Sequence, residues 1–305
     1  ITTGSGNEVL GYNALGANTE GSFNIAIGQS SLSNNVLGNK SVAIGLSALG
    51  TQNPASASDM YNVAIGHNAG LSVTTGTTNT LIGAQAGDAL TTGVRNTAVG
   101  YNALSSETGA GQLTAIGQDA LKTYNKGSGD GNNVAVGYHS AQLMSTGTNS
   151  VIIGALAGNA LTTGSSNVVV GHNALGSEDT GGRNIAIGSN ALSNLNVDTD
   201  SYNIGIGHDA SRNITSGQAN TIIGGLAGDA LTTGFRNVGL GYFALSTETG
   251  SSKSVAIGTE ALKNQNVGSG DAFNTAIGDS AGEEITTGTE NTLIGALAGD
   301  ALTTG

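Results

Sequence analysis

The chain has 305 residues, with 51 Gly, one Pro, no Trp, no Cys, 4% aromatic residues and a formal net charge of −12. Its nine Lys and Arg residues are scattered, which disfavours nucleic acid as a partner, and it has no apolar run of about 18 residues that would predict a transmembrane helix. The lack of Cys excludes disulfides and thiolate metal sites, and Gly-rich disorder is disfavoured because 37% of the residues are hydrophobic.

A five-residue motif, Asn-x-x-(Ile/Val/Leu)-Gly, recurs 17 times through the whole chain, with Asn at its first position in 13 copies and Ser in three. Successive motif glycines lie about 17 residues apart, and every fourth spacing is longer by two to four positions. Four units make a super-repeat of about 71 residues, so residues 1–305 are interpreted as one repetitive domain of four super-repeats plus one unit. The 17 motif glycines are Gly11, Gly28, Gly45, Gly66, Gly83, Gly100, Gly117, Gly137, Gly154, Gly171, Gly188, Gly207, Gly224, Gly241, Gly258, Gly278 and Gly295.

Each unit predicts one short strand that ends at the aliphatic residue before the glycine, from Leu10 and Ile27 to Ile277 and Ile294. The glycine should need a positive φ or a close backbone approach, and the Asn four residues before it should form a side-chain ladder. We expect ladders of β-branched residues to fill the inside. We expect the Ala and Leu ladders that follow the glycine to lie against neighbouring chains.

A unit of about 17 residues is too short for a repeat with a helix and matches one turn of a parallel β-solenoid. The sequence therefore predicts an all-β solenoid of about 17 turns. Every fourth turn carries an insertion that should bulge outward, at Gly50–Tyr61, Lys122–Asn132, Ser193–Tyr202 and Lys263–Phe273.

One turn of each super-repeat is marked by a near-copy of the closing sequence Asn291–Gly305. It has a larger residue in mid-strand, such as Leu293, where most units have Ala. It also has Gly299 where neighbouring units have Leu. The pattern predicts a compensating exchange of volume between two ladders.

The segments "NVAIGHNAG" (Asn62–Gly70), "SVAIGLSALG" (Ser41–Gly50) and "NTAVGYNALSS" (Asn96–Ser106) resemble the head repeats of trimeric autotransporter adhesins. They are still more similar to repeats of bacteriophage tail-fibre proteins and related bacterial surface fibres. The resemblance covers nearly the whole chain and implies a left-handed β-roll in which three chains associate. This sequence differs from the adhesin head in having longer turns, and it shows no stalk, neck or anchor.

The inserted turns carry the candidate ligand contacts. One carboxylate per insertion, without a partner at metal-binding spacing, makes a poor cation site, and solubilising turn residues are the plainer interpretation. Aromatic residues there could stack on sugars, or could instead shield the corner. The candidate contacts are Asp59, Tyr61, Asp130, Asp200, Tyr202, Asp271 and Phe273.

No other pattern predicts a site. His67, His172 and His208 directly follow a motif glycine, but that position varies freely, and neither these nor His139 form a His-x-His pair. No Ser/His/Asp set or carboxylate pair stands out, so we expect no enzyme, no cofactor and no metal.

The function expected is a structural, extracellular fibre or filament shaft, on a virion tail or a cell surface, with self-association and an adhesive role. One alternative is an adhesin head that binds a cell-surface glycan or receptor through the inserted turns. Another, less favoured, is an ice-binding solenoid built on the recurring Thr-Thr-Gly. Because Ile1–Gly4 repeats Ile285–Gly288 and Gly305 stops within a unit, we expect each end to be covered by more chain, another domain or a stacked subunit.

Overall fold

The computed structural model describes residues 3–305, and within that range it contains strands and no helix. The chain forms two compact units, Ile1–Asn149 and Ser150–Gly305. The first copies of Ile-Thr-Thr-Gly and Thr-Thr-Gly begin at Ile1 and Thr2, which lie outside the described residues.

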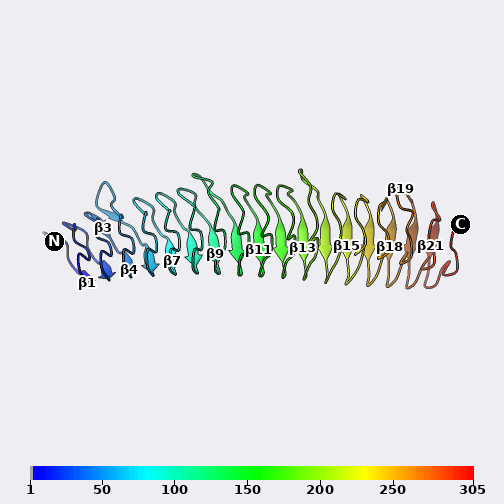
Figure 1. The fold of residues 1–305 in the computed structure, drawn as a ribbon, viewed down its shortest axis with the longest axis horizontal. Helices are drawn as coiled ribbons and strands as arrows, with labels where there is room; N and C mark the ends of the chain where they lie inside the picture. The colour runs from blue at the N-terminus through cyan, green and yellow to red at the C-terminus, as the bar shows by residue number, and fades with distance from the viewer. Residues whose placement is uncertain (1–2) are drawn as a thin grey trace. The chain divides into compact units, whose positions relative to one another are not determined.

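In each unit a three-residue strand precedes every motif glycine and pairs in parallel with the strand of the next turn (Figure 1). Equivalent repeat positions face one another, as in the pairs Ala26–Ala43 and Val168–Ile185. The seventeen parallel strands confirm the predicted β-solenoid of about 17 turns.

The strands of the first unit are β1 (Glu8–Leu10), β2 (Ile25–Ile27), β4 (Val42–Ile44), β6 (Val63–Ile65), β7 (Thr80–Ile82), β8 (Thr97–Val99), β9 (Thr114–Ile116) and β10 (Val134–Val136). Those of the second are β11 (Val151–Ile153), β12 (Val168–Val170), β13 (Ile185–Ile187), β14 (Ile204–Ile206), β15 (Thr221–Ile223), β16 (Val238–Leu240), β18 (Val255–Ile257), β20 (Thr275–Ile277) and β21 (Thr292–Ile294).

Two of the four inserted turns pair with the preceding turn through a second, shorter parallel ladder. Strand β3 (Gly38–Asn39) pairs with β5 (Ser58–Asp59), and β17 (Ser251–Ser252) pairs with β19 (Gly270–Asp271). A single bridge joins Gly111 to Asp130 at the equivalent place in another insertion. Three of the four insertions are therefore tied to the preceding turn at a candidate ligand contact, namely Asp59, Asp130 or Asp271.

The prediction that β-branched residues fill the interior is wrong. Side chains alternate along a strand, and the middle residue is the one that points inward. Ala43 and Ala64 are fully buried, whereas Ile65 is 36% exposed. No residue at either end of the strands that precede a motif glycine is buried. The β-branched ladders form the outer face of the sheet.

The prediction for the ladders after the glycine is wrong for the same reason. Ala48 and Leu49 are fully buried in the chain itself, and so are Ala103 and Leu104. So short a turn encloses little space, and one mid-strand side chain and this Ala-Leu pair therefore occupy much of it. The Ala and Leu ladders are thus the core, and the sheet face is what remains for other contacts.

The asparagine ladder is confirmed. The Asn62 side-chain oxygen accepts from the backbone N–H of Asn79 at 2.9 Å and from its amide group at 3.2 Å. The Asn79 amide group also donates to the carbonyl of Gly93 at 2.9 Å. The carboxamides of Asn62 and Asn79 thus satisfy backbone groups of neighbouring turns that burial would otherwise leave unpaired.

The motif glycines have the predicted positive φ. Gly83 has φ of 132°, and a Cβ there would lie 2.5 Å from the carbonyl oxygen of Gly100, the motif glycine of the next turn. Both the dihedral and the contact exclude a side chain.

The predicted exchange of volume is also present. Gly87 follows the large mid-strand residue Leu81, and a Cβ at Gly87 would lie 2.8 Å from a Leu81 methyl group. Leu81 also fills the space at Gly70 of the previous turn, where a Cβ would lie 2.6 Å from its other methyl group. A large mid-strand residue therefore requires a small residue after the glycine in two turns.

Candidate functional site: a cationic and aromatic corner

The residue five positions before each motif glycine forms a second ladder, which we call the corner ladder. Its backbone N–H donates to the preceding turn, as from Arg236 to the Gln218 carbonyl at 3.0 Å. Its non-glycine members all have φ between 51° and 62°. Those members are Phe23, Lys40, Tyr61, Thr78, Arg95, Gln112, Asn132, Asn149, Ser166, Arg183, Tyr202, Ala219, Arg236, Lys253, Phe273 and Glu290.

The corner ladder concentrates the positive charge of an acidic chain. It holds five of the nine Lys and Arg residues, although the net charge is −12, and four aromatic residues. Sequence reasoning missed this, because it treated the cations as scattered. The signal was available as a fixed distance of five residues before the glycine. The five cations are Lys40, Arg95, Arg183, Arg236 and Lys253.

In the first insertion, Asp59 and Tyr61 meet a cation of the previous turn. The Lys40 Nζ lies 2.7 Å from an Asp59 carboxylate oxygen, donates to the Tyr61 hydroxyl at 3.2 Å and lies 5.3 Å from the centre of that ring. The hydrogen bond from Lys40 lowers the pKa of the Asp59 carboxyl and raises the pKa of Lys40.

Two further insertions repeat this arrangement, which we call the corner clamp. Asp200 binds Arg183 at 2.6 Å, and the Arg183 guanidinium lies 5.7 Å from the ring centre of Tyr202. Lys253 binds Asp271 at 2.6 Å and lies 5.0 Å from the ring centre of Phe273. The three clamps join cation, carboxylate and ring across two turns.

The remaining insertion lacks the clamp. Gln112 takes the place of the cation and Asn132 that of the ring, and the carboxylate of Asp130 forms no ion pair with any residue in the range 3–305. The Lys126 ammonium donates to the Asp130 carbonyl at 2.8 Å. The seven candidate residues thus lie at equivalent corner positions of their own turns, in three complete sets and one reduced set. Ligand contact by them stays a prediction, because the clamp gives six of them an internal partner.

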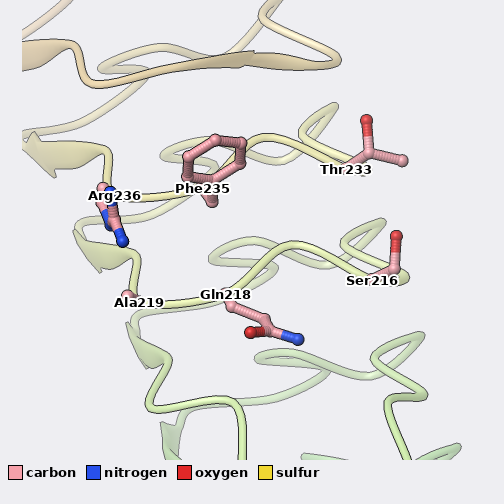
Figure 2. A pocket seen from close by; sticks show the side chains of 6 residues that line it. All are labelled: Ser216, Gln218, Ala219, Thr233, Phe235 and Arg236. Atoms are coloured by element: carbon pink, nitrogen blue, oxygen red, sulfur yellow. The ribbon is translucent and has the colours of Figure 1, made fainter.

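Arg95 and Arg236 differ from the clamped cations, since neither forms an ion pair with a described residue. Arg236 borders a pocket of about 330 Å³. Figure 2 shows the side chains that line it, which come from two successive turns. They are Ser216, Gln218, Ala219, Thr233, Phe235 and Arg236.

Buried carboxylates lie elsewhere, at the turns that precede three of the insertions. Glu107, Glu178 and Glu248 are fully buried. Glu107 accepts the backbone N–H groups of Gly109 and Ala110 at 2.6 and 2.7 Å and that of Lys126, in the insertion, at 2.9 Å. Burial raises the pKa of Glu178, against the opposing effect of its backbone hydrogen bonds. These carboxylates anchor the insertions.

The histidines lie apart from one another. His67, His172 and His208 are exposed beside the sheet face, and the His139 Nε2 lies 3.2 Å from an Asp119 carboxylate oxygen. No group of three or more His, Cys, Asp or Glu residues in the described part of the chain is arranged to hold a metal ion.

No helix within residues 3–305 has the length and apolar character needed to cross a membrane. Comparison with models of protein families, with curated proteins and with solved structures found no match for this chain.

Proposed function

We propose that the chain is a structural segment of an extracellular homotrimeric fibre, and that the outer face of its sheet is the contact between copies. The supporting observation is the exposure of that face. Each strand that precedes a motif glycine ends in Ile, Val or Leu, and Ile116 and Ile153 are 37% and 38% exposed. Solvent-exposed apolar patches of this continuity are rare in monomers.

The same face continues at the position after the motif glycine. Large side chains recur there with high exposure, including Tyr12 at 81%, Leu46 at 41% and Tyr101 at 50%. An apolar row with one side chain per turn fits best against a surface with the same repeat spacing. A second copy of the chain has the same spacing because its sequence is identical, which favours self-association over an unrelated partner. The resemblance to trimeric surface fibres supports three copies.

The test is the mass of the purified chain by sedimentation equilibrium, with electron microscopy of the same sample. We expect three times 29.8 kDa. Ile116→Glu together with Ile65→Glu should yield monomers, because two charges per chain would be buried without partners. Thr92→Glu, on an exposed corner of the same unit, is the matched control and should remain trimeric. A monomeric unmodified chain at about 100 µM would overturn the proposal.

The alternative of an adhesin that binds glycans through its inserted turns has less support. In three insertions the carboxylate and the ring are engaged by a cation of the same chain. Glycan binding that survives deletion of these insertions would exclude it.

The ice-binding alternative also has less support. The first hydroxyl of several Thr-Thr-Gly segments donates to a carbonyl of the next turn, at 2.7 Å from Thr91 to Thr108 and from Thr232 to Thr249. Thermal hysteresis with shaped ice crystals would restore this alternative.

A further inference from the structure

We infer that the pocket beside Arg236 binds a sugar residue that carries a carboxylate, such as a uronic or sialic acid unit of a surface glycan. This site is separate from the insertions and from the sheet face. It lies on turns of ordinary length, outside the seven residues predicted to contact a ligand.

The first support is an unpaired cation held in place. Arg236 is exposed and has no acidic partner among residues 3–305, while the next cation of the ladder, Lys253, is neutralised by Asp271. A guanidinium presents a planar pair of N–H donors that matches a carboxylate. Arg236 is therefore free to take a carboxylate from outside the chain.

The second support is an apolar surface beside the cation. Phe235 is 40% exposed, and the Arg236 guanidinium lies 5.6 Å from the centre of its ring. Two hydrogen bonds to the next turn fix the backbone of Phe235. Its N–H donates to the Ser252 hydroxyl at 3.1 Å, and its carbonyl accepts from the backbone N–H of Lys253 at 3.1 Å. A pyranose ring has an apolar face that packs on an aromatic ring, as sugar-binding sites use.

The third support is the shape and the remaining polar groups. The corner residue one turn earlier is Ala219, whose short side chain leaves the space next to Arg236 open (Figure 2). Gln218, Ser216 and Thr233 line the same space with an amide and two hydroxyls, which suit sugar hydroxyls. A volume of about 330 Å³ is at the small end for ligand pockets, roughly 300–1,000 Å³, and fits one or two sugar units.

The charge of the whole chain selects a singly charged ligand. A net charge of −12 repels a densely sulfated polymer, whereas a single carboxylate experiences this repulsion once and meets Arg236 directly. We therefore expect carboxylated sugars to bind and heparin-like polymers to bind less well.

The chain contains its own matched control. Arg95 occupies the same repeat position two super-repeats earlier and is also unpaired, but Val94 stands there in place of Phe235. Thr77 and Thr78 replace Gln218 and Ala219. A charge effect alone would act equally at both arginines.

The experiment is calorimetric titration of the intact protein with 3′-sialyllactose, with a glucuronate disaccharide, with neutral lactose and with heparin. We expect a carboxylated sugar to bind at least tenfold more tightly than lactose. Arg236→Ala should weaken binding at least tenfold and Phe235→Ala several-fold, whereas Arg95→Ala and Val94→Ala should leave it unchanged.

The inference would be overturned if Arg236→Ala and Arg95→Ala lost equal sugar affinity, or if lactose bound as tightly as the carboxylated sugars. Tighter binding of heparin than of these sugars would also overturn it, as would no binding of either acid. The mass of each variant is measured alongside. An unmodified protein that binds a carboxylated sugar as expected but is monomeric counts against the proposed trimer only. A trimeric unmodified protein that binds neither acid counts against the pocket only.

Discussion

The turn of residues 79–95 and the turn of residues 96–112 are neighbours in one ladder, with Leu81 paired to Ala98, but they fill their interior in different ways. The first uses Leu81 in mid-strand and Gly87 after the motif glycine. The second uses Ala98 and Leu104 at these places. The enclosed space is fixed by the backbone, so volume added at one ladder is removed at the other.

The same two turns differ at a third position, seven residues after the glycine. Leu90 stands there in the first turn and the buried Glu107 in the second. The turn after Leu90 is of ordinary length, whereas the turn after Glu107 carries an insertion whose Lys126 N–H needs an acceptor. In this pair of turns, the buried carboxylate of Glu107 thus precedes an insertion, and the apolar Leu90 precedes a turn of ordinary length.

The largest loss of unfolding free energy should come from removing the mid-strand side chain of the turn of residues 79–95. Leu81→Ala removes a fully buried side chain that fills the space at two turns, and should lower the free energy of unfolding by about 4 kcal/mol. Denaturant unfolding followed by circular dichroism measures it. A loss below about 1 kcal/mol would mean that the turns collapse to fill the space.

Gly87→Leu should lower the free energy of unfolding slightly less, by about 3 kcal/mol. It overfills the same interior, because it places a β-carbon 2.8 Å from a Leu81 methyl group. The double variant Leu81→Ala/Gly87→Leu copies the neighbouring turn and should recover most of the stability. Strict additivity of the two single losses would contradict the compensation between ladders.

Glu107→Leu copies Leu90 into a turn that precedes an insertion. It should cost about 2 kcal/mol, because three backbone N–H groups lose their acceptor. Hydrogen exchange of the Lys126 amide should accelerate. Glu107→Gln keeps an oxygen acceptor and should lower the free energy of unfolding less than Glu107→Leu. An equal loss would mean that the charge of Glu107, rather than its hydrogen bonds, stabilises the turn.

The smallest effect expected is a pH dependence at Glu178. Burial raises its pKa in the folded chain above the ordinary value of 4.5, so the folded state binds this proton more tightly than the unfolded state. The contribution of Glu178 to stability should therefore increase as the pH falls through its folded pKa towards 4.5. The difference in unfolding free energy between the unmodified chain and Glu178→Gln, measured from pH 7 to 4, should show this slope. A slope of opposite sign would mean that the hydrogen bonds to the carboxylate outweigh its burial.

The turn count, the strand positions, the asparagine ladder and the volume exchange could be predicted because each is written at a fixed repeat position. Which face of the strand points inward could not. Val63, Ala64 and Ile65 fit either orientation by alternation, and the choice depends on how much space the rest of the turn leaves. The corner clamps were missed for a related reason, since Lys40 and Asp59 are separated by a whole turn.

The sequence by itself determined the repeat period and the positive φ of the motif glycines. It also determined the exchange of volume by which the large Leu81 is accompanied by the small Gly87. All three follow because equivalent positions in a parallel ladder must stack. Only the tertiary structure decided the rest. Closing so short a turn leaves room for Ala64 but not for Val63 and Ile65, which turns the apolar ladder outward. Stacking successive turns then brings charges that are distant in sequence together, as in Lys253 and Asp271, and leaves Arg236 without an acidic partner among the described residues.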